Sequence, residues 1–339
     1  MATGAMLFVP AALIRTYWVF LIGLFSIGTG LTILQAAANP YITIVGPIES
    51  AAKRISIMGI CNKFAGIIAP LIFAAIILKS SDSVIFEQLN VGAFSEAEKD
   101  VVLDGLIRRV IWPYSILSIF LFAVGIFIRY SVLPEINQEE ENKEVETDDG
   151  KSHTSILQFP YLLMGAVAMF LHVGTQVIAI DTIIGYANSM YMDLLEAKVF
   201  PSYTLTATIC GYIMGIILIP KYLSQKRAFQ ICCTLGLIFS LGVVLSNMQV
   251  SFLGHDANFS IWFLVLLGFP NSLIYAGIWP LSIRGLGRFT KIGSSLLIMG
   301  LCGNAILPLI YGHFADLFSV KQAYWVLIPC YLYLIVFLF

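Results

Sequence analysis

The sequence predicts an all-α polytopic membrane protein, and two observations lead to that fold class. Of the 339 residues, 59% are hydrophobic and only 12% are charged, whereas a soluble domain carries about 25% charged residues. The chain also contains several apolar stretches of the length that a helix needs to cross a bilayer, about 20 residues. Helices are expected because each span in lipid must satisfy its own backbone hydrogen bonds.

Nine apolar spans follow one another along the chain, and residues 1–14 look like the end of a further span. We find neither a basic start nor a clear cleavage site in residues 1–14, so no cleavable signal peptide is expected. The nine expected spans are 17–38, 55–78, 108–130, 157–186, 203–220, 229–247, 260–283, 292–313 and 322–339.

A near repeat relates two of these spans. The segment from Ile57 reads Ile-Met-Gly-Ile-Cys, and the segment from Ile298 reads Ile-Met-Gly-Leu-Cys. Each copy is preceded by a proline, Pro40 or Pro280, and each is followed by Pro-Leu-Ile. Five matched positions can arise by chance in so apolar a chain. The order of the flanking prolines favours a true repeat, which is typical of transporters built from related halves.

Residues 134–155 differ from the rest of the chain, with eight acidic residues against two lysines. Such a composition cannot bury a core and predicts a mobile linker, with an acidic docking tail as the alternative. We therefore expect a partial N-terminal bundle over 1–133, the linker over 134–155 and a six-helix C-terminal bundle over 156–339.

The first bundle is expected to be incomplete. From Leu157 to Pro280 there are 123 residues, but only 39 residues precede Pro40, a shortfall of 84 residues. This difference corresponds to about three helices with their loops. We therefore expect a fragment that lacks its first two helices and most of the third, and that does not transport by itself. An in-frame coding stretch upstream of Met1 would support this expectation.

Basic residues in the short loops predict the orientation. Eight of them fall on one side of the membrane and five on the other, while Arg108 and Arg109, at the end of a span, are assigned to neither side. The more basic side is expected to be cytoplasmic. The acidic linker then lies in the cytoplasm, and a bacterial inner membrane is the expected location. The eight are Lys53, Arg54, Lys221, Lys226, Arg227, Arg284, Arg288 and Lys291.

Polar side chains inside spans are costly, so they are the candidates for function. In span 17–38 and just beyond it, Thr32, Gln35 and Asn39 share one face of the helix. In span 55–78, Asn62 and Lys63 are adjacent, and Lys63 is expected ~15 Å deep. A lysine there should face a wet cavity or a partner carboxylate. The alternatives are hydrogen bonds between helices for the amides and snorkelling for Lys63.

Three further candidates lie in span 157–186. His172 and Gln176 are one turn apart and share a face, whereas Asp181 points about half a turn away on an unbroken helix. All three line one cavity only if the helix is broken or the cavity is wide. The alternatives are a packed core histidine and an aspartate at the outer membrane interface.

Span 260–283 contains Asn271, Tyr275 and Trp279 at spacings of four residues. A polar group beside two aromatic rings is a common arrangement for binding a sugar, although aromatic residues also anchor helices at membrane interfaces. Asn304, in span 292–313, is the rough counterpart of Asn62 in the repeat.

Several functional classes lack support in the sequence. The net charge of −1 gives no indication of a nucleic-acid partner. The six cysteines fall in apolar spans without a metal-binding or CxxC spacing, so we expect neither a metal nor a disulfide framework. No P-loop, HExxH, GxSxG or acid dyad suggests an enzyme, and no cofactor is expected.

The segment from Leu34 to Tyr41, which reads Leu-Gln-Ala-Ala-Ala-Asn-Pro-Tyr, resembles the fucose/glucose/galactose–proton symporter family of the major facilitator superfamily. Gly46-Pro47, the span with Asn62, the region 275–287 and Lys291-Ile-Gly-Ser-Ser resemble that family as well. The resemblance covers nearly the whole chain and is weakest at 80–106. It implies the major facilitator fold, with helices 1 and 2 and most of helix 3 missing.

The resemblance also implies roles for single residues. Asn62 looks like a sugar-contacting asparagine of the family, and Gln176 looks like a glutamine of its seventh helix. Gln35 stands where the fucose members have a glutamate that takes part in proton coupling, and an amide cannot titrate. In this respect the chain looks more like the glucose/galactose branch.

We therefore expect a secondary active transporter for a hexose or a related monosaccharide, working by alternating access. Substrate would lie between Gln35, Asn62, Gln176, Asn271 and Tyr275. The further cavity or coupling candidates are Asn39, Lys63, His172, Asp181 and Asn304. The coupling ion is expected to be H⁺, with Na⁺ as the alternative, and the protein is expected to be a monomer in the lipid bilayer. The alternative functions are a sugar receptor that does not transport and an inactive fragment of a transporter.

Overall fold

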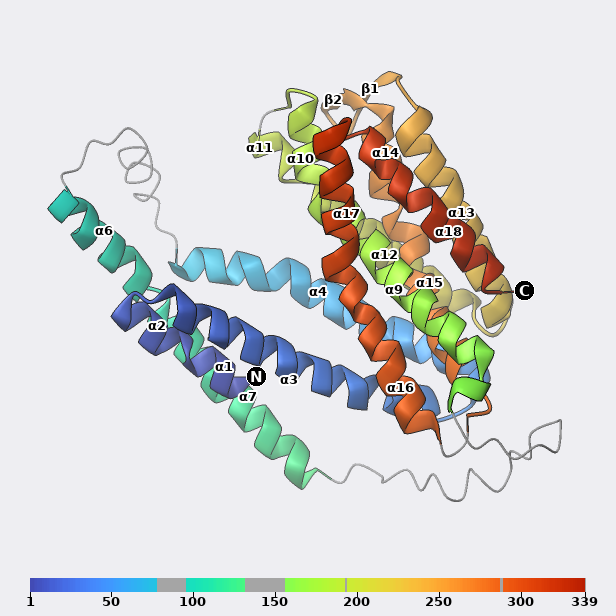
Figure 1. Cartoon of the computed structure of the whole chain (residues 1–339), viewed down its shortest axis with the longest axis horizontal. Helices are drawn as coiled ribbons and strands as arrows, with labels where there is room; N and C mark the ends of the chain where they lie inside the picture. Colours follow the sequence, from blue (N-terminus) through green and yellow to red (C-terminus); the bar gives the residue numbers. More distant parts are fainter. Residues whose placement is uncertain (78–95, 132–155, 193, 287–288, 339) are drawn as a thin grey trace. The chain divides into compact units, whose positions relative to one another are not determined.

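The structure is a computed structural model that describes residues 1–77, 96–131, 156–192, 194–286 and 289–338 (Figure 1). It consists almost entirely of helices, as the sequence predicts. The predicted linker at 134–155 lies outside the described residues. The first group of helices is α1 (Ala2–Met6), α2 (Phe8–Ile14), α3 (Tyr17–Ile44), α4 (Ala51–Ile77), α6 (Glu96–Arg108) and α7 (Ile111–Tyr130).

The later part of the chain adds a second group of helices and one β-hairpin. These elements are α9 (Pro160–Asp181), α10 (Ile183–Ser189), α11 (Leu194–Ala197), α12 (Phe200–Leu218), α13 (Gln225–Leu245), β1 (Gln249–Phe252), β2 (His255–Asn258), α14 (Phe259–Leu266), α15 (Gly268–Ile283), α16 (Thr290–Met299), α17 (Gly303–Leu317) and α18 (Leu327–Val336). Short 3₁₀ turns occur at η1 (Ile48–Ser50), η2 (Ile156–Gln158), η4 (Gly300–Cys302) and η5 (Gln322–Val326).

Within the described residues, seven helical stretches are long and apolar enough to cross a membrane: 17–42, 98–130, 160–181, 200–218, 225–245, 259–283 and 290–317. Shorter apolar helices cover 2–14 and 322–336. Every predicted span overlaps a helix of the structure. The sequence did not predict helix α6 or the hairpin, in which Gln249 of β1 pairs with Asn258 of β2.

Capping groups account for the start of two helices after the loops. The Ser224 hydroxyl accepts a hydrogen bond from the Arg227 backbone N–H at 3.3 Å and begins α13. The Asn258 side chain accepts one from the Ser260 N–H at 3.0 Å and begins α14. Such caps satisfy backbone donors that the first turn of a helix leaves unpaired.

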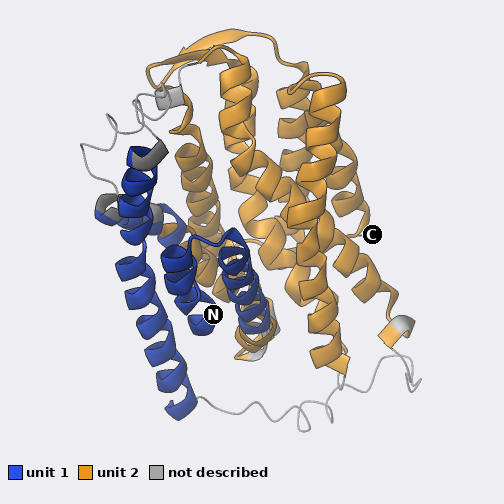
Figure 2. Ribbon diagram, turned by 60° about the vertical axis from the view of Figure 1, so that its left-hand side comes forward, with its two compact units in different colours: residues 1–35, 65–135 blue, residues 36–64, 136–339 orange. Residues whose placement is uncertain are grey.

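The described chain forms two compact units, residues 1–35 with 65–135, and residues 36–64 with 136–339 (Figure 2). In these units, residues 36–64 group with the later helices. The division of the chain into 1–133, 134–155 and 156–339 stays a prediction.

The first unit is held together by aromatic packing and one cluster of charges. The Phe8 ring stacks on Tyr114 at 4.2 Å between centroids and meets Phe20 at 4.6 Å. Arg15, in a left-handed conformation with φ 53°, ends α2. Its guanidinium lies 3.3 Å from Asp100 and 3.1 Å from Asp104.

The second unit has a continuous hydrophobic core centred on α15. In the apolar stretch within 259–283, 78% of the residues are buried, whereas in the apolar stretch within 17–42 only 6% are buried. Helix α15 packs against α9, α12 and α13, and small residues permit close approach. At Gly268, for example, an added Cβ would lie 2.2 Å from the Thr204 carbonyl oxygen. The core of this unit therefore places α9 and α15 side by side.

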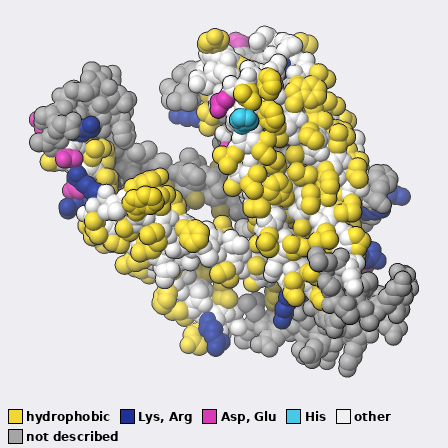
Figure 3. Space-filling view, in the orientation of Figure 1, with side chains coloured by type: hydrophobic (Ala, Val, Ile, Leu, Met, Phe, Trp, Pro, Cys, Tyr) yellow, Lys and Arg dark blue, Asp and Glu magenta, His cyan; other side chains and the backbone are white. Residues whose placement is uncertain are grey.

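Large apolar side chains remain exposed on helices of both units, for example Phe127 at 74% on α7 and Leu309 at 73% on α17. Figure 3 shows hydrophobic side chains over most of the visible described surface, with few charged groups among them. A soluble protein rarely exposes such large apolar areas. This surface is the one expected of a multi-pass membrane protein.

Candidate substrate site

Polar side chains from several helices meet in the second unit, and the pair Asn39–Tyr275 is one part of this group. Asn39, near the end of α3, is 2% exposed, and its amide donates a hydrogen bond to the Tyr275 hydroxyl at 3.0 Å. Tyr275 lies on α15, one turn from both Asn271 and Trp279. The sequence predicted both Asn39 and Tyr275 as candidates, and the structure brings Asn39 into contact with α15.

Asn271 is more deeply packed than an open binding residue. It is 1% exposed, and its side-chain oxygen accepts a hydrogen bond from the Tyr331 hydroxyl of α18 at 2.7 Å. Its amide nitrogen has no partner among the described residues. Tyr331 therefore fixes the orientation of Asn271 and leaves one amide donor group unused, which is uncommon for a buried polar group.

Trp279 is fully buried within the second unit. Its ring lies 6.4 Å from that of Tyr275, at an interplanar angle of 64°. A ring enclosed by protein does not reach a lipid interface, so its packing does not favour the membrane-anchor alternative.

His172 faces the same group of residues from α9. Its side chain is fully buried, and its ring lies 6.4 Å from the Tyr275 ring. Neither ring nitrogen has a hydrogen-bond partner in the part of the chain that the structure describes. The histidine is thus packed, but the hydrogen bonds of an ordinary core histidine are missing here. Gln176, one turn further along α9, is half-buried.

Lys63 and Asp181 bring opposite charges to this region. Lys63 is half-buried on α4, and Asp181 is the exposed last residue of α9. Among the described residues, no ion pair joins the two side chains. Helix α9 ends at Asp181, and α10 begins at Ile183 after a single turn residue, Thr182. This break lies beyond His172, Gln176 and Asp181, which share the continuous helix α9, so it does not turn Asp181 toward the face of the other two.

Helix α4 approaches α12 at the repeated glycine. A Cβ added at Gly59 would lie 2.4 Å from Cζ of the Tyr212 ring. Asn62, on the same helix, is exposed. The backbone N–H of Ala52 donates to the Gln225 side chain at 3.2 Å and joins the start of α4 to α13. Two contacts with the later helices thus hold the first half of α4.

Two further predicted residues remain to be described. Gln35 is half-buried on α3 and belongs to the first unit, and Asn304 is exposed on α17. The Thr32 hydroxyl, expected on the same stripe as Gln35, donates to the Gly28 carbonyl at 2.9 Å within its own helix.

Sequence reasoning missed Tyr212 and Tyr331. Each is a tyrosine on an apolar helix, and its role depends on a partner far away in the sequence, Gly59 or Asn271. The signal that was available for Tyr212 is Gly59 itself, because a glycine inside a span often marks a close approach by another helix.

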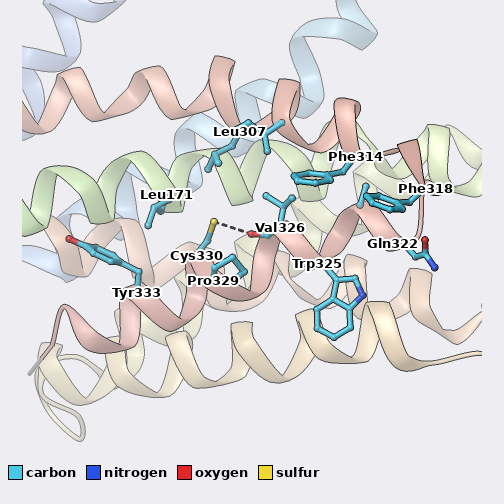
Figure 4. A pocket seen from close by; sticks show the side chains of 12 residues that line it. Leu171, Leu307, Phe314, Phe318, Gln322, Trp325, Val326, Pro329, Cys330 and Tyr333 are labelled. Carbon is cyan, nitrogen blue, oxygen red and sulfur yellow. Dashed lines mark hydrogen bonds between the residues drawn. The ribbon is translucent and has the colours of Figure 1, made fainter. Parts of the chain in front are cut away.

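The second unit also has an apolar groove of about 850 Å³, lined largely by α17, η5 and α18 (Figure 4). Leu307, Phe314, Trp325 and Tyr333 are among its lining residues, and Gln322 is the polar side chain at one end. None of the predicted site residues lines it. Its chemistry suits hydrocarbon rather than a polyhydroxylated substrate.

A comparison of the sequence with models of protein families agrees with this arrangement of long apolar helices around a few polar groups. Residues 1–294 match the family model described as Major Facilitator Superfamily. The chain belongs to this superfamily. Its fold is the major facilitator fold, and its relatives are transporters rather than enzymes.

Named relatives and a solved structure extend this finding. The glucose/galactose transporter of Brucella abortus biovar 1 (strain 9-941) is 30% identical over 335 residues, which is 98% of this chain and 74% of that protein. The L-fucose-proton symporter of Escherichia coli (strain K12) is 27% identical over 315 residues, 93% of this chain and 70% of that one. A crystal structure of the superfamily transporter FucP in the outward conformation superposes with a TM-score of 0.81. It is 24% identical and covers 99% of this chain and 79% of that one.

Proposed function

We propose that this protein is a secondary active transporter that moves a hexose or a related monosaccharide across the membrane by alternating access, coupled to protons. The observation that carries the proposal is a polar group of side chains inside an apolar major facilitator fold. The printed names of two relatives, a glucose/galactose transporter and an L-fucose-proton symporter, support the substrate class and the coupling ion.

In this proposal the substrate contacts are Gln35, Asn62, Gln176, Asn271 and Tyr275. Asn39, Lys63, His172, Asp181 and Asn304 line the cavity or take part in coupling. The hydrogen bond from Asn39 to Tyr275 supports the assignment of Asn39 to this cavity. No cofactor takes part, because a gradient drives this class of transport.

We further propose a monomer in a bacterial inner membrane, with the acidic segment 134–155 in the cytoplasm. Two bundles, joined by that segment, would rock about a central site. The excess of lysine and arginine in the loops on the same side supports this orientation.

Uptake by cells tests the function. Cells that lack their own hexose and fucose uptake systems receive the gene, including any coding sequence upstream of Met1. Labelled D-glucose, D-galactose and L-fucose are supplied separately. We expect at least one sugar to accumulate above its external concentration and to leave again when the proton gradient is collapsed. Binding of a sugar without accumulation would favour a receptor instead.

A further inference from the structure

Asn271 of α15 has one paired and one unpaired polar atom in the core of the second unit. Its side-chain oxygen accepts a hydrogen bond from the Tyr331 hydroxyl at 2.7 Å, whereas its amide nitrogen has no partner among the described residues. Asn271 is 1% exposed, and Tyr331 is fully buried. A buried donor without a partner is uncommon, because an unmade hydrogen bond costs free energy. The NH₂ group is therefore the part of Asn271 that remains for a ligand.

Helix α13 holds the Tyr331 side chain in place. A Cβ added at Gly236 of α13 would overlap the Tyr331 ring, so the ring packs against the glycine itself. Helix α13 also packs against α15, where a Cβ added at Gly277 would lie 2.5 Å from Cδ2 of the Phe229 ring. Side chains packed this closely keep one rotamer. One helix thus positions both the tyrosine on α18 and the helix that carries Asn271.

An amide that is fixed in this way presents only a donor to a ligand. The asparagine side chain has an oxygen acceptor and an NH₂ donor group, and a half-turn of the amide exchanges their places. In Asn271 the half-turn would break the hydrogen bond that the Tyr331 hydroxyl donates to the oxygen. The bond from Tyr331 therefore opposes the exchange and keeps the NH₂ group free.

We propose that Tyr331 is a positioning residue of the sugar site, an inference that rests on the proposed function. Tyr331 holds the amide of Asn271 so that its NH₂ group donates a hydrogen bond to one hydroxyl oxygen of the sugar. The protein recognises that hydroxyl as an acceptor, and the hydrogen of the hydroxyl is not required. Alternating access rearranges the helices around a central site, and the amide meets the sugar in the state that opens the packing around α15.

Sugar analogues test the donor role. The protein, as its gene encodes it, is purified and titrated with D-glucose, D-galactose and L-fucose, and then with deoxy and deoxyfluoro analogues of the sugar that binds most tightly, one hydroxyl at a time. Fluorine accepts a hydrogen bond weakly and donates none, whereas a deoxy position does neither. At one position we expect the deoxy analogue to bind about tenfold more weakly than the sugar, as for one unmade hydrogen bond, and the fluoro analogue to recover part of this loss. In Asn271→Ala the two analogues should bind equally at that position.

A double-mutant cycle tests the positioning role. Tyr331→Phe removes the hydroxyl and keeps the ring that packs on Gly236, and its affinity for the sugar should fall about threefold to tenfold. In the Asn271→Ala background the same change should cause no further fall, because Tyr331 acts through Asn271. Tyr324→Phe is the matched control. Tyr324 is also fully buried, but its hydroxyl oxygen lies 2.8 Å from that of Thr182, so this variant should bind sugar like the parent.

Two results would overturn the inference. One is a fluoro analogue that binds no better than the deoxy analogue at every hydroxyl, or a difference between them that persists in Asn271→Ala, since either result removes the donor role of this amide. The other is an equal effect of Tyr331→Phe with and without Asn271, which would assign Tyr331 to packing alone. Both results come from a parent protein that binds a sugar. A parent that binds none of glucose, galactose and fucose contradicts the proposed function instead.

Discussion

The two copies of the repeated segment lie in different surroundings, although four of their five residues are identical. Ile57–Cys61 is part of the continuous helix α4, and an added Cβ at Gly59 would meet the end of the Tyr212 side chain. Ile298–Cys302 spans the change from α16 to the 3₁₀ turn η4. There an added Cβ at Gly300 would lie 2.8 Å from the Ala166 carbonyl oxygen.

The residues that directly follow each copy also lie in different surroundings. In register, Asn62 corresponds to Gly303, and Lys63 corresponds to Asn304. A Cβ at Gly303 would lie 1.9 Å from the Phe170 carbonyl oxygen of α9, so a side chain has no room there. The second copy thus packs backbone against backbone, whereas the first copy packs against a side chain and keeps a polar amide and a cation. The same local sequence serves rigid packing in one copy and the proposed site in the other.

The largest loss of stability is expected for Gly303→Ala. The new methyl group meets a backbone carbonyl that cannot rotate away, and overpacking of this kind costs about 1–3 kcal/mol or more. We expect a lower melting temperature and a lower protein level, measured in detergent. Gly312→Ala on the same helix is the control, because nothing lies within 4 Å of its added Cβ. Equal stability of the two variants would contradict the close packing of α17 on α9.

Asn62→Ala and Gln35→Ala should weaken sugar binding with little change in protein level. An amide that hydrogen-bonds a sugar hydroxyl leaves an unpaired partner when it is removed, which costs about 1–3 kcal/mol. The affinity should therefore fall roughly 5- to 150-fold, since about 1.4 kcal/mol is tenfold. Titration of the purified variants with sugar measures this affinity. Asn304→Ala, from the other copy, is expected to lose less, and equal losses at Asn62 and Asn304 would remove the functional difference between the copies.

Gly59→Ala should have a smaller effect on stability than Gly303→Ala. The added methyl group meets the end of the Tyr212 side chain rather than a backbone carbonyl, so the cost is expected to be lower than at Gly303, about 1 kcal/mol. A double-mutant cycle with Tyr212→Leu should show a coupling energy between the two residues. Additive melting temperatures would mean that α4 and α12 do not meet at this glycine.

The smallest effect at neutral pH is expected for Gln35→Glu. The new carboxyl group titrates, so sugar uptake should depend more steeply on pH than in the parent protein. Initial uptake rates measured over a series of pH values test this. Identical pH profiles would mean that a carboxyl at residue 35 takes no part in coupling in this protein.

Much of the fold could be predicted because a span in lipid is set by local composition. The long apolar runs identified the helices, and turn spacing placed Asn271, Tyr275 and Trp279 one above another on α15. The hairpin at 249–258 has no such signal, since its strands are short and partly polar.

The site could be predicted only as single residues. The hydrogen bonds from Asn39 to Tyr275 and from Tyr331 to Asn271 join positions far apart in the sequence, and no local pattern specifies them. Lys63 is an intermediate case. Its depth predicted a cavity or a carboxylate partner, and the structure places its side chain half-buried on α4.

Transport by the reconstituted protein tests the central claim most directly. The protein encoded by the gene is placed in vesicles with labelled glucose, galactose or fucose outside, and an inward proton gradient is imposed. We predict that at least one sugar accumulates inside above its external concentration and that an ionophore for protons abolishes the accumulation. Entry of none of these sugars above the level in protein-free vesicles, with or without a gradient, would contradict the account.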